Sequence, residues 1–218
     1  MAPGGEVLTG MILKSTPIGE YDRRVEILTR ERGRISAFAR GARKPGNQLM
    51  AAASPFVMGT FRIFFGRSSN QLLSAEVEQF FAELRSDMTA ACYGSYFMEL
   101  LEYCTAENMD ATPLLILGYQ ALRALSSRKF DYRLVRCVFE IKTVMLEGEY
   151  EIPAAESGYL EATLHTLGFL QRTPPAGVYT FRVSEEVLRE LIVVAGRLCR
   201  RTFPHHFASL DILEVVAK

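Results

Sequence analysis

The feature that most constrains the fold of this 218-residue chain is a change in the spacing of its apolar residues. Up to about residue 80, apolar residues recur at every second position, as in the stretches 25–27 and 35–39. From Leu84 onward they recur every three or four positions, as between Met88 and Leu100. The first spacing is typical of β-strands and the second of helices. We therefore predict a two-domain α+β protein with a boundary between residues 80 and 81.

The first domain, residues 1–80, contains five short stretches with strand character, separated by tight turns. In the first stretch, Val7, Thr9, Met11 and Leu13 alternate with residues that we expect to be exposed, and residues 15–22 have the composition of a turn. Gly33 closes a compact turn in which a positive φ is needed. Five strands within about 80 residues predict a small closed barrel of the OB-fold type.

The second domain, residues 81–218, reads as an all-α bundle with recognisable helix ends. Asp131 and Ser184 each precede an apolar helical pattern and are good N-caps. Pro113 follows Thr112 at the start of another helix, and Gly148 is well placed to end the helix that begins after Asp131. We expect a further helix to begin at Ser157.

Several classes of protein are disfavoured by the sequence. No apolar run approaches the length needed to span a bilayer, and the first ten residues lack the basic and apolar regions of a signal peptide, so we expect a cytoplasmic protein. The stretch Gly5–Ile12 has the glycine spacing of a phosphate loop, but Met11 stands where the lysine is required. Because no other catalytic motif stands out, we expect that the chain is not an enzyme.

The net charge of zero hides a strong asymmetry. Residues 1–75 carry 11 Lys and Arg against 5 Asp and Glu, whereas the rest of the chain carries 14 against 20. A basic first domain is where a polyanion would bind. The candidate phosphate-binding residues lie mostly at strand ends and turns: Arg30, Arg32, Arg34, Arg40, Arg43 and Lys44. A solvated basic face explains the same pattern, and composition alone slightly favours it.

Two aromatic residues bear on that choice, because OB-type barrels bind single strands with a basic groove and stacking rings. Phe38 is on the same strand face as Arg40, and Phe64 is on the same face as Arg62, opposite the apolar residues. Either ring could instead fill the junction between the two domains, a role that suits Phe64 better. We predict Phe38 as the stacking residue.

The stretch Gly10–Pro45 resembles the start of the bacterial DNA repair protein RecO family. The matching residues are Gly19, Glu20, Asp22, Thr29, Glu31 and Gly33, followed by the run Ala39–Lys44. Residues 55–77 are similar to the fourth and fifth strands of the family, and residues 205–213 are similar to its closing motif. The resemblance therefore covers nearly the whole chain.

This resemblance implies an N-terminal OB-fold, a helical C-terminal domain and a role in DNA recombination by the RecF pathway. It implies binding to single- and double-stranded DNA, annealing of complementary strands, and loading of recombinase onto DNA coated with single-stranded DNA-binding protein. The implied partners are RecR and the C-terminal tail of single-stranded DNA-binding protein, in the cytoplasm at the nucleoid. The alternative is a protein-interaction scaffold whose OB-fold has lost its affinity for DNA.

Many members of that family carry a four-cysteine zinc module after the helix that here ends near Gly148. In this chain residues 149–164 contain no cysteine, and Cys92, Cys104, Cys137 and Cys199 form no C-x-x-C pair. We therefore expect no metal and no cofactor.

An acidic peptide tail needs cations beside an apolar pocket. In the second domain Arg128, Lys129 and Arg133 lie close together in sequence, next to Leu122 and the aromatic residues Phe130 and Tyr132. We predict that this junction receives the tail, although an acidic domain can also simply scatter its cations.

Overall fold

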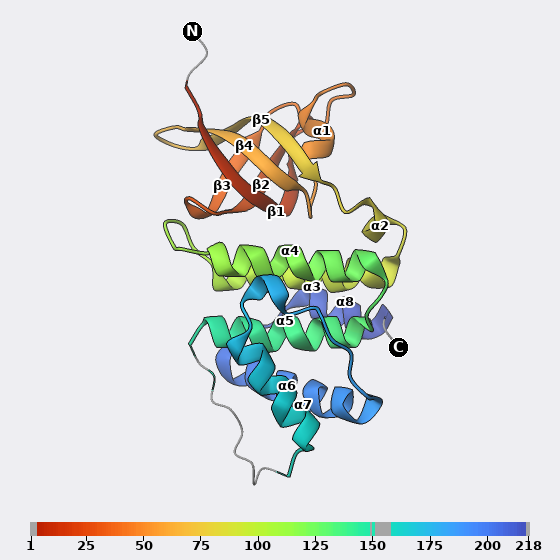
Figure 1. The fold of residues 1–218 in the computed structure, drawn as a ribbon. Helices are drawn as coiled ribbons and strands as arrows, with labels where there is room; N and C mark the ends of the chain where they lie inside the picture. The colour runs from red at the N-terminus through yellow and green to blue at the C-terminus, as the bar shows by residue number, and fades with distance from the viewer. Residues whose placement is uncertain (1–3, 149, 151–157, 217–218) are drawn as a thin grey trace. The chain divides into compact units, whose positions relative to one another are not determined.

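The structure is a computed structural model, and it describes residues 4–148, 150 and 158–216. Five strands are followed by helices, as predicted (Figure 1). The strands and the helix among them are β1 (Glu6–Ile18), β2 (Asp22–Thr29), β3 (Gly33–Ala39), α1 (Leu49–Ala52), β4 (Met58–Phe65) and β5 (Asn70–Gln79). The later elements are α2 (Ala82–Arg85), α3 (Met88–Cys104), α4 (Thr112–Ser127), α5 (Tyr132–Leu146), α6 (Glu161–Arg172), the 3₁₀ turn η2 (Pro175–Gly177), α7 (Glu185–Thr202) and α8 (Ala208–Val216).

The five strands form a closed barrel in the order β1-β2-β3-β5-β4, which confirms the predicted OB-type barrel. Every neighbouring pair is antiparallel except β3 and β5, which run parallel and pair over only two positions, Ala37 with Asn70 and Phe38 with Gln71. The closure between β3 and β5 is therefore the weakest seam of the barrel. Helix α1, which the sequence pattern did not reveal, lies next to β5 beside this seam.

The barrel encloses an apolar core to which all five strands contribute. Val25, Ile27, Ile35 and Ala37 point inward as the alternation predicted, and Phe61, Ile63 and Leu72 join them from β4 and β5. A closed barrel is possible because each strand keeps one apolar face toward this interior. The partners of these inward residues along each strand consequently lie on the outer surface.

The prediction for β1 was wrong in two respects. Leu8 and Ile12 enter the barrel core, whereas Val7 is half-exposed and Met11 is buried on the other face of the strand. The strand also continues through the turn-like residues 15–18, so that only residues 19–21 remain as the turn. Both errors have one reason. The register shifts between Ile12 and Lys14, and β1 is buried on both faces near its middle, so alternation does not identify the inner face.

The helix ends follow the predicted chemistry. Asp131 is the N-cap of α5 and accepts from the Arg133 amide at 2.8 Å, and Ser184 caps α7 by accepting from the Val187 amide at 3.4 Å. Gly148 has φ +82° directly after the end of α5. Helix α6 begins at Glu161. Ser157, the predicted start of that helix, lies outside the described residues, as do most residues of the segment 149–157.

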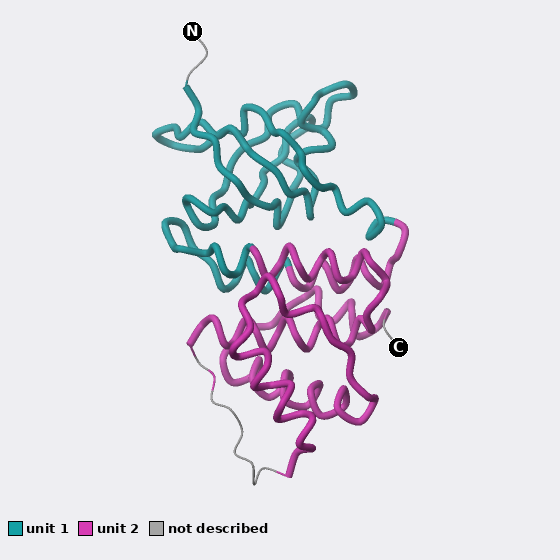
Figure 2. Tube along the Cα trace, viewed as in Figure 1, with its two compact units in different colours: residues 1–85, 98–115 teal, residues 86–97, 116–218 magenta. Residues whose placement is uncertain are grey.

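Two compact units emerge from the contacts within the chain (Figure 2). Unit 1 contains residues 1–85 and 98–115, and unit 2 contains residues 86–97 and 116–218. The end of α3 and the start of α4 thus belong with the barrel, and the domain boundary between residues 80 and 81 stays a prediction. Among the described helices, none combines the length and the apolar character needed to cross a membrane.

Candidate nucleic-acid interface

The loop after β3, which carries the sequence ARGARK, is a fixed turn. Gly41 has φ +67°, and its amide donates to the Asp22 carboxylate at 2.7 Å. The Arg43 amide donates to the Tyr21 carbonyl at 2.8 Å, so the loop is tied to the turn between β1 and β2. Glycine is required at position 41 because of its φ and because a Cβ there would meet Asn47 Nδ2 at 2.8 Å. The cations of this loop are consequently held in place by backbone contacts.

Arg43 and Lys44 both lie at the surface beside Tyr21. The Arg43 guanidinium donates to the Gly19 carbonyl at 3.0 Å, and Lys44 Nζ lies 4.9 Å from the centre of the Tyr21 ring. Neither side chain has an acidic partner among the ion pairs of the described residues. Their charge therefore remains available to an anion.

Arg32, at the opposite end of β3, is already neutralised. It donates to both oxygens of Glu6, at 3.1 and 2.7 Å, and its guanidinium carbon lies 4.9 Å from the centre of the Phe65 ring. The hydrogen bond from Arg32 holds the pKa of the Glu6 carboxyl below its usual value. A bidentate pair of this kind competes with any phosphate for the guanidinium.

Arg34 is also engaged inside unit 1. Its Nε donates to the Thr105 carbonyl at 2.9 Å, and its Nη1 is 3.5 Å from the Glu26 carboxylate. The backbone repeats this contact, because the Arg34 amide donates to the Ala106 carbonyl and the Asn108 amide donates to the Arg32 carbonyl. We call residues 32–34 the packed end of β3. Arg30, just before this end, is exposed.

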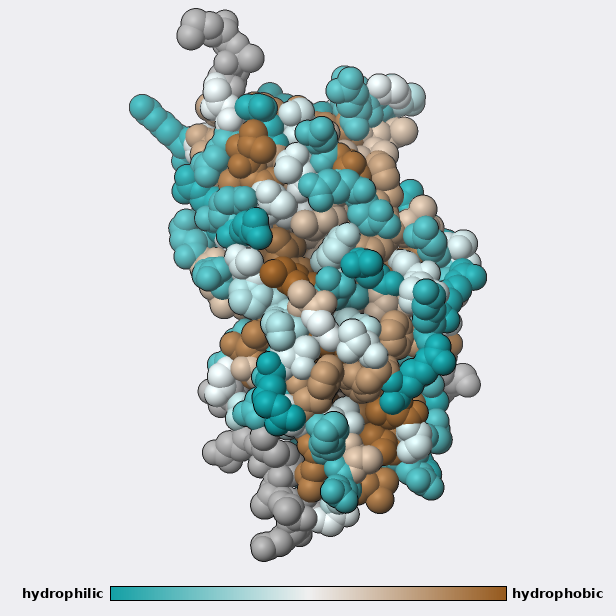
Figure 3. Space-filling view, viewed as in Figure 1, coloured by the Kyte–Doolittle hydropathy of each residue, from teal (hydrophilic) through white to brown (hydrophobic). Residues whose placement is uncertain are grey.

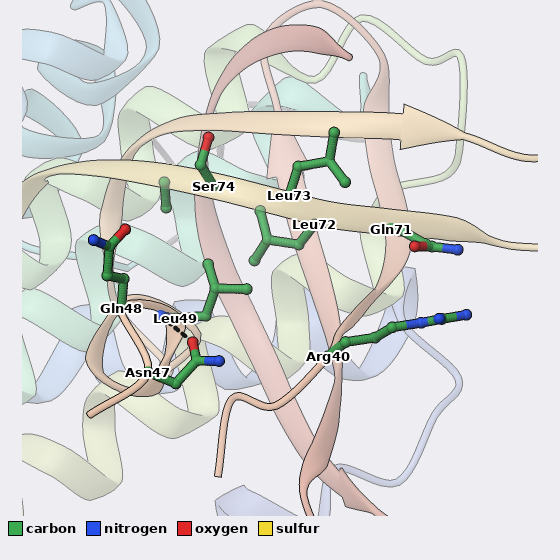
Figure 4. Close-up of a pocket in the computed structure, with 9 residues that line it drawn as sticks. Arg40, Asn47, Gln48, Leu49, Gln71, Leu72, Leu73 and Ser74 are labelled. Carbon is green, nitrogen blue, oxygen red and sulfur yellow. Dashed lines mark hydrogen bonds between the residues drawn. The ribbon is translucent and has the colours of Figure 1, made fainter. Parts of the chain in front are cut away.

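Arg40 differs from the other predicted arginines. It is exposed, and in the described part of the chain its side chain has no hydrogen bond, ion pair or ring partner. It lies on the rim of a cavity of about 440 Å³ next to the β3–β5 seam (Figure 4). We call this cavity the seam pocket; its lining residues are Arg40, Asn47, Gln48, Leu49, Gln71, Leu72, Leu73, Ser74 and Ala75. We call residues 38–40 the open end of β3.

A row of side chains crosses the outer surface of the barrel at the open end of β3. The register pairs Arg24 with Phe38, Phe38 with Gln71, and Gln71 with Phe64, so these four residues lie on one face across four strands. That face is the outer one, because the residues adjoining each of them in sequence, such as Ala37 and Leu72, are in the core. Phe38 and Phe64 are half-buried. Two rings flanking an amide are suited to stacking unpaired bases, whereas Arg24 at the end of the row is engaged by Ser36 at 2.8 Å and by Glu26 at 3.4 Å.

The barrel surface around this row is mainly polar. Figure 3 shows small apolar areas separated by hydrophilic side chains over the barrel on the face drawn. The large exposed apolar residues of the barrel include Val7, Met50 and Leu73. This composition resembles protein–DNA interfaces, which are more polar than interfaces between proteins.

Comparisons with known proteins identify the family of this chain. The family model for the N-terminal part of recombination protein O matches residues 6–81, and the model for its C-terminal part matches residues 85–149. The chain belongs to the RecO family. The barrel thus corresponds to the N-terminal part of a RecO protein and helices α3–α5 to its C-terminal part, in the same order.

Individual relatives support the assignment to RecO. The DNA repair protein RecO of Acetivibrio thermocellus is 25% identical, over 95% of this chain and 96% of the relative. RecO of Bacillus pumilus is 33% identical over 64% of this chain, and RecO of an Exiguobacterium species is 32% identical over 55%. The last two matches span about half of each relative, 54% and 48%. Membership of this family supports a function in DNA repair and recombination.

The predicted tail-binding cations of the RecO helical region lie in unit 2 and are partly engaged. Arg133 forms two hydrogen bonds with Glu185, both at 3.0 Å, and also binds Asp131, and these carboxylates raise the pKa of its guanidinium. Arg128 lies 3.8 Å from Asp87, and the Lys129 carbonyl accepts from Arg182 at 3.1 Å. The assignment of these residues to a peptide tail stays a prediction.

A small cavity of about 200 Å³ adjoins Arg133 in the same unit. It is lined by Tyr93, Arg133, Arg136, Cys137, Glu140 and Ile192. At its base, Glu140 accepts from both Arg136 and Tyr96 at 2.8 Å, and burial raises the pKa of the Cys137 thiol. This thiol is therefore a weak nucleophile and a poor metal ligand. Within the described ranges, no three His, Cys, Asp or Glu side chains are grouped closely enough to hold a metal ion.

The prediction from sequence did not include Gln71, Asn47 and Gln48 as site residues, and it treated Phe64 as a filler. The sequence could have shown that Gln71 is on the outer face, because it alternates with the inward-facing Leu72. That Gln71 lies between Phe38 and Phe64 depends on the two-residue parallel pairing of β3 with β5, which no local pattern indicates.

Proposed function

We propose that this chain is a non-enzymatic mediator of recombinational repair that binds single- and double-stranded DNA and anneals complementary strands. It would help to load recombinase onto DNA coated with single-stranded DNA-binding protein, at the nucleoid in the cytoplasm. The observation that carries the proposal is the unpaired Arg40 beside the outer row of Phe38, Gln71 and Phe64. Family membership supports the same class of function.

The proposed mechanism rests on the difference between free and engaged cations. Arg30, Arg40, Arg43 and Lys44 would contact backbone phosphates, because none of them has an acidic partner among the ion pairs of the described chain. Arg32 and Arg34 would contribute less, since a phosphate must first displace Glu6 or Glu26. Neutralised phosphates repel a complementary strand less strongly, so two strands held in this way can pair.

A salt titration of DNA binding tests this proposal. We expect binding of single strands and duplexes to weaken steeply with salt, because each phosphate contact releases counterions. Fluorescently labelled complementary strands would report annealing in the same buffers. The alternative function, a protein-interaction scaffold without DNA affinity, predicts no binding even at low salt, and that result would reject the proposal.

We propose RecR and the C-terminal tail of single-stranded DNA-binding protein as protein partners. The tail is acidic, and Arg133 lines the small cavity together with Ile192 and Tyr93, while Arg128 and Lys129 stand five and four positions before Arg133 in the chain. A carboxylate of the tail would replace Glu185 on Arg133 while an apolar side chain entered the cavity. Charge competition of this kind makes the binding sensitive to salt.

Charge reversal tests the tail site. Changing Arg128, Lys129 and Arg133 together to Glu should abolish binding of a tail peptide, measured by fluorescence anisotropy. The matched control reverses Arg172, Arg197 and Arg200, which are exposed on α6 and α7 and do not line the cavity, and should retain binding. Unchanged peptide binding in the first variant would remove this site.

A further inference from the structure

The seam pocket exists because two strands separate. β3 ends at Ala39, and Gly41 turns the chain away, while β5 continues for eight residues beyond Gln71. In the described ladders β5 pairs with β4 along this length but with β3 only at Asn70 and Gln71. The edge of β5 facing the pocket therefore lacks a strand partner. Helix α1 lies beside this edge and closes the space only in part.

The floor and the rim of the seam pocket differ in chemistry. Leu49 and Leu72, each less than a tenth exposed, make an apolar floor. The rim carries the amides of Asn47, Gln48 and Gln71 and the guanidinium of Arg40. Figure 4 shows the Leu49 and Leu72 side chains between the strand and the loop, with Arg40 and Gln71 extending to the same side of the view.

The polar side chains of the rim can form hydrogen bonds with a ligand. The Asn47 oxygen accepts from the Leu49 amide at 2.8 Å, which fixes the orientation of its side-chain amide. The side chains of Gln48 and Gln71 form no hydrogen bond with any other described residue. Amide groups pair with the donors and acceptors on base edges, and an apolar floor suits the face of a base.

We propose that the seam pocket receives one unstacked base of a single DNA strand, with Arg40 on an adjoining phosphate. The inference rests on the DNA-binding function proposed above and adds a site that reads a base. A cavity of about 440 Å³ is within the size range of small-molecule pockets, which begins near roughly 300 Å³. A duplex cannot supply this base without breaking a pair, so the pocket favours single strands.

The base pocket also fits strand annealing. One base held in the pocket anchors the strand, and Phe38 and Phe64 on the outer row support its neighbours by stacking. Bases beyond the barrel stay free to pair with a second strand. Once pairing spreads to the anchored base, the duplex withdraws it, so annealing itself releases the product.

The test uses the full-length chain and three DNA probes of equal length, about 15 nucleotides, near the upper site size of one OB barrel. The first is a thymidine strand, the second a strand of abasic sites with the same phosphates, and the third a blunt duplex. We expect the wild type to bind the thymidine strand about tenfold more tightly than the abasic strand at one salt concentration. The double variant Gln48→Ala/Gln71→Ala should lose most of that difference, because only stacking on Phe38 and Phe64 remains, and it should keep its affinity for the duplex.

Gln79→Ala is the matched control, since Gln79 is on the same strand but outside the pocket. It should behave as the wild type with all three probes, and circular dichroism should show that both variants are folded. Equal wild-type affinity for the thymidine and abasic strands would overturn the base pocket while leaving phosphate binding intact. A preference for thymidine as large in the double variant as in the wild type would also overturn it, by placing base recognition elsewhere. Failure to bind any probe at low salt would instead reject the DNA-binding function itself.

Discussion

The two ends of β3 present arginines of identical chemistry in opposite states. At the packed end, Arg32 is bound to Glu6 and Arg34 to Glu26 and the Thr105 carbonyl. At the open end, Arg40 has no partner among the described residues and borders a cavity. The difference shows that a count of basic residues along a strand overstates the charge available to an anion. What decides availability is whether an acidic residue from another strand is within reach.

The largest effect on stability should come from a substitution that disrupts the packed end of β3. Gly33 has φ +64°, and a Cβ there would meet the Ala106 carbonyl at 2.3 Å, so Gly33→Ala must shift the backbone. We expect a loss on the order of 3–4 kcal/mol in the free energy of unfolding, measured by urea denaturation. Gly46→Ala is the control, because Gly46 has φ +80° but open space around it. It should lose only about 1–2 kcal/mol, and equal losses in the two variants would show that the packed end is not tightly packed.

A smaller effect is expected at the aromatic row of the open end. If bases stack on Phe38, Phe38→Ala should weaken single-strand binding by about 1–3 kcal/mol with little change in the salt slope. Fluorescence anisotropy at several salt concentrations measures both quantities. A lower melting temperature with unchanged affinity of the folded protein would instead identify Phe38 as a packing residue.

The loop cations at the open end should change the salt slope without changing stability. Arg43→Ala/Lys44→Ala removes two contacts and should flatten the slope on single strands by about 1.4 units. Because both side chains are exposed, stability should stay within about 0.5 kcal/mol. All DNA sequences should weaken about equally, since phosphate contacts carry no base information. An unchanged salt slope would show that Arg43 and Lys44 belong to an ordinary solvated turn and do not contact phosphates.

The smallest effect gives the sharpest test of the comparison. Arg40→Gln should reduce the salt slope by about 0.7 units, because it removes one free cation. Arg32→Gln should leave the slope nearly unchanged, since that guanidinium is held by Glu6. Equal effects of the two substitutions would mean that DNA displaces Glu6 and that both ends of β3 bind phosphates.

Much of the fold could be predicted because it depends on local patterns. Alternation identified the inward residues of β2 and β3, and the caps Asp131 and Ser184 act as expected. The prediction failed for β1, which is buried on both faces, and for α1, which has only four residues and no side-chain cap. A helix that short has no stability of its own, so its packing beside β5 determines it.

The candidate site could be predicted only in part. The sequence by itself determined that the barrel half is basic and that Phe38 and Arg40 are on the outer side of β3. It also placed Gly33 and Gly41 in the turns before and after this strand. Charge, alternation and the need for glycine in a turn can all be read from the chain. Only the tertiary structure decided which cations are free, since Glu6 and Arg32 are 26 positions apart and meet through strand pairing. The same is true of the seam pocket. It forms where β3 and β5 separate, and strands distant in sequence separate for reasons of barrel closure that no local pattern contains.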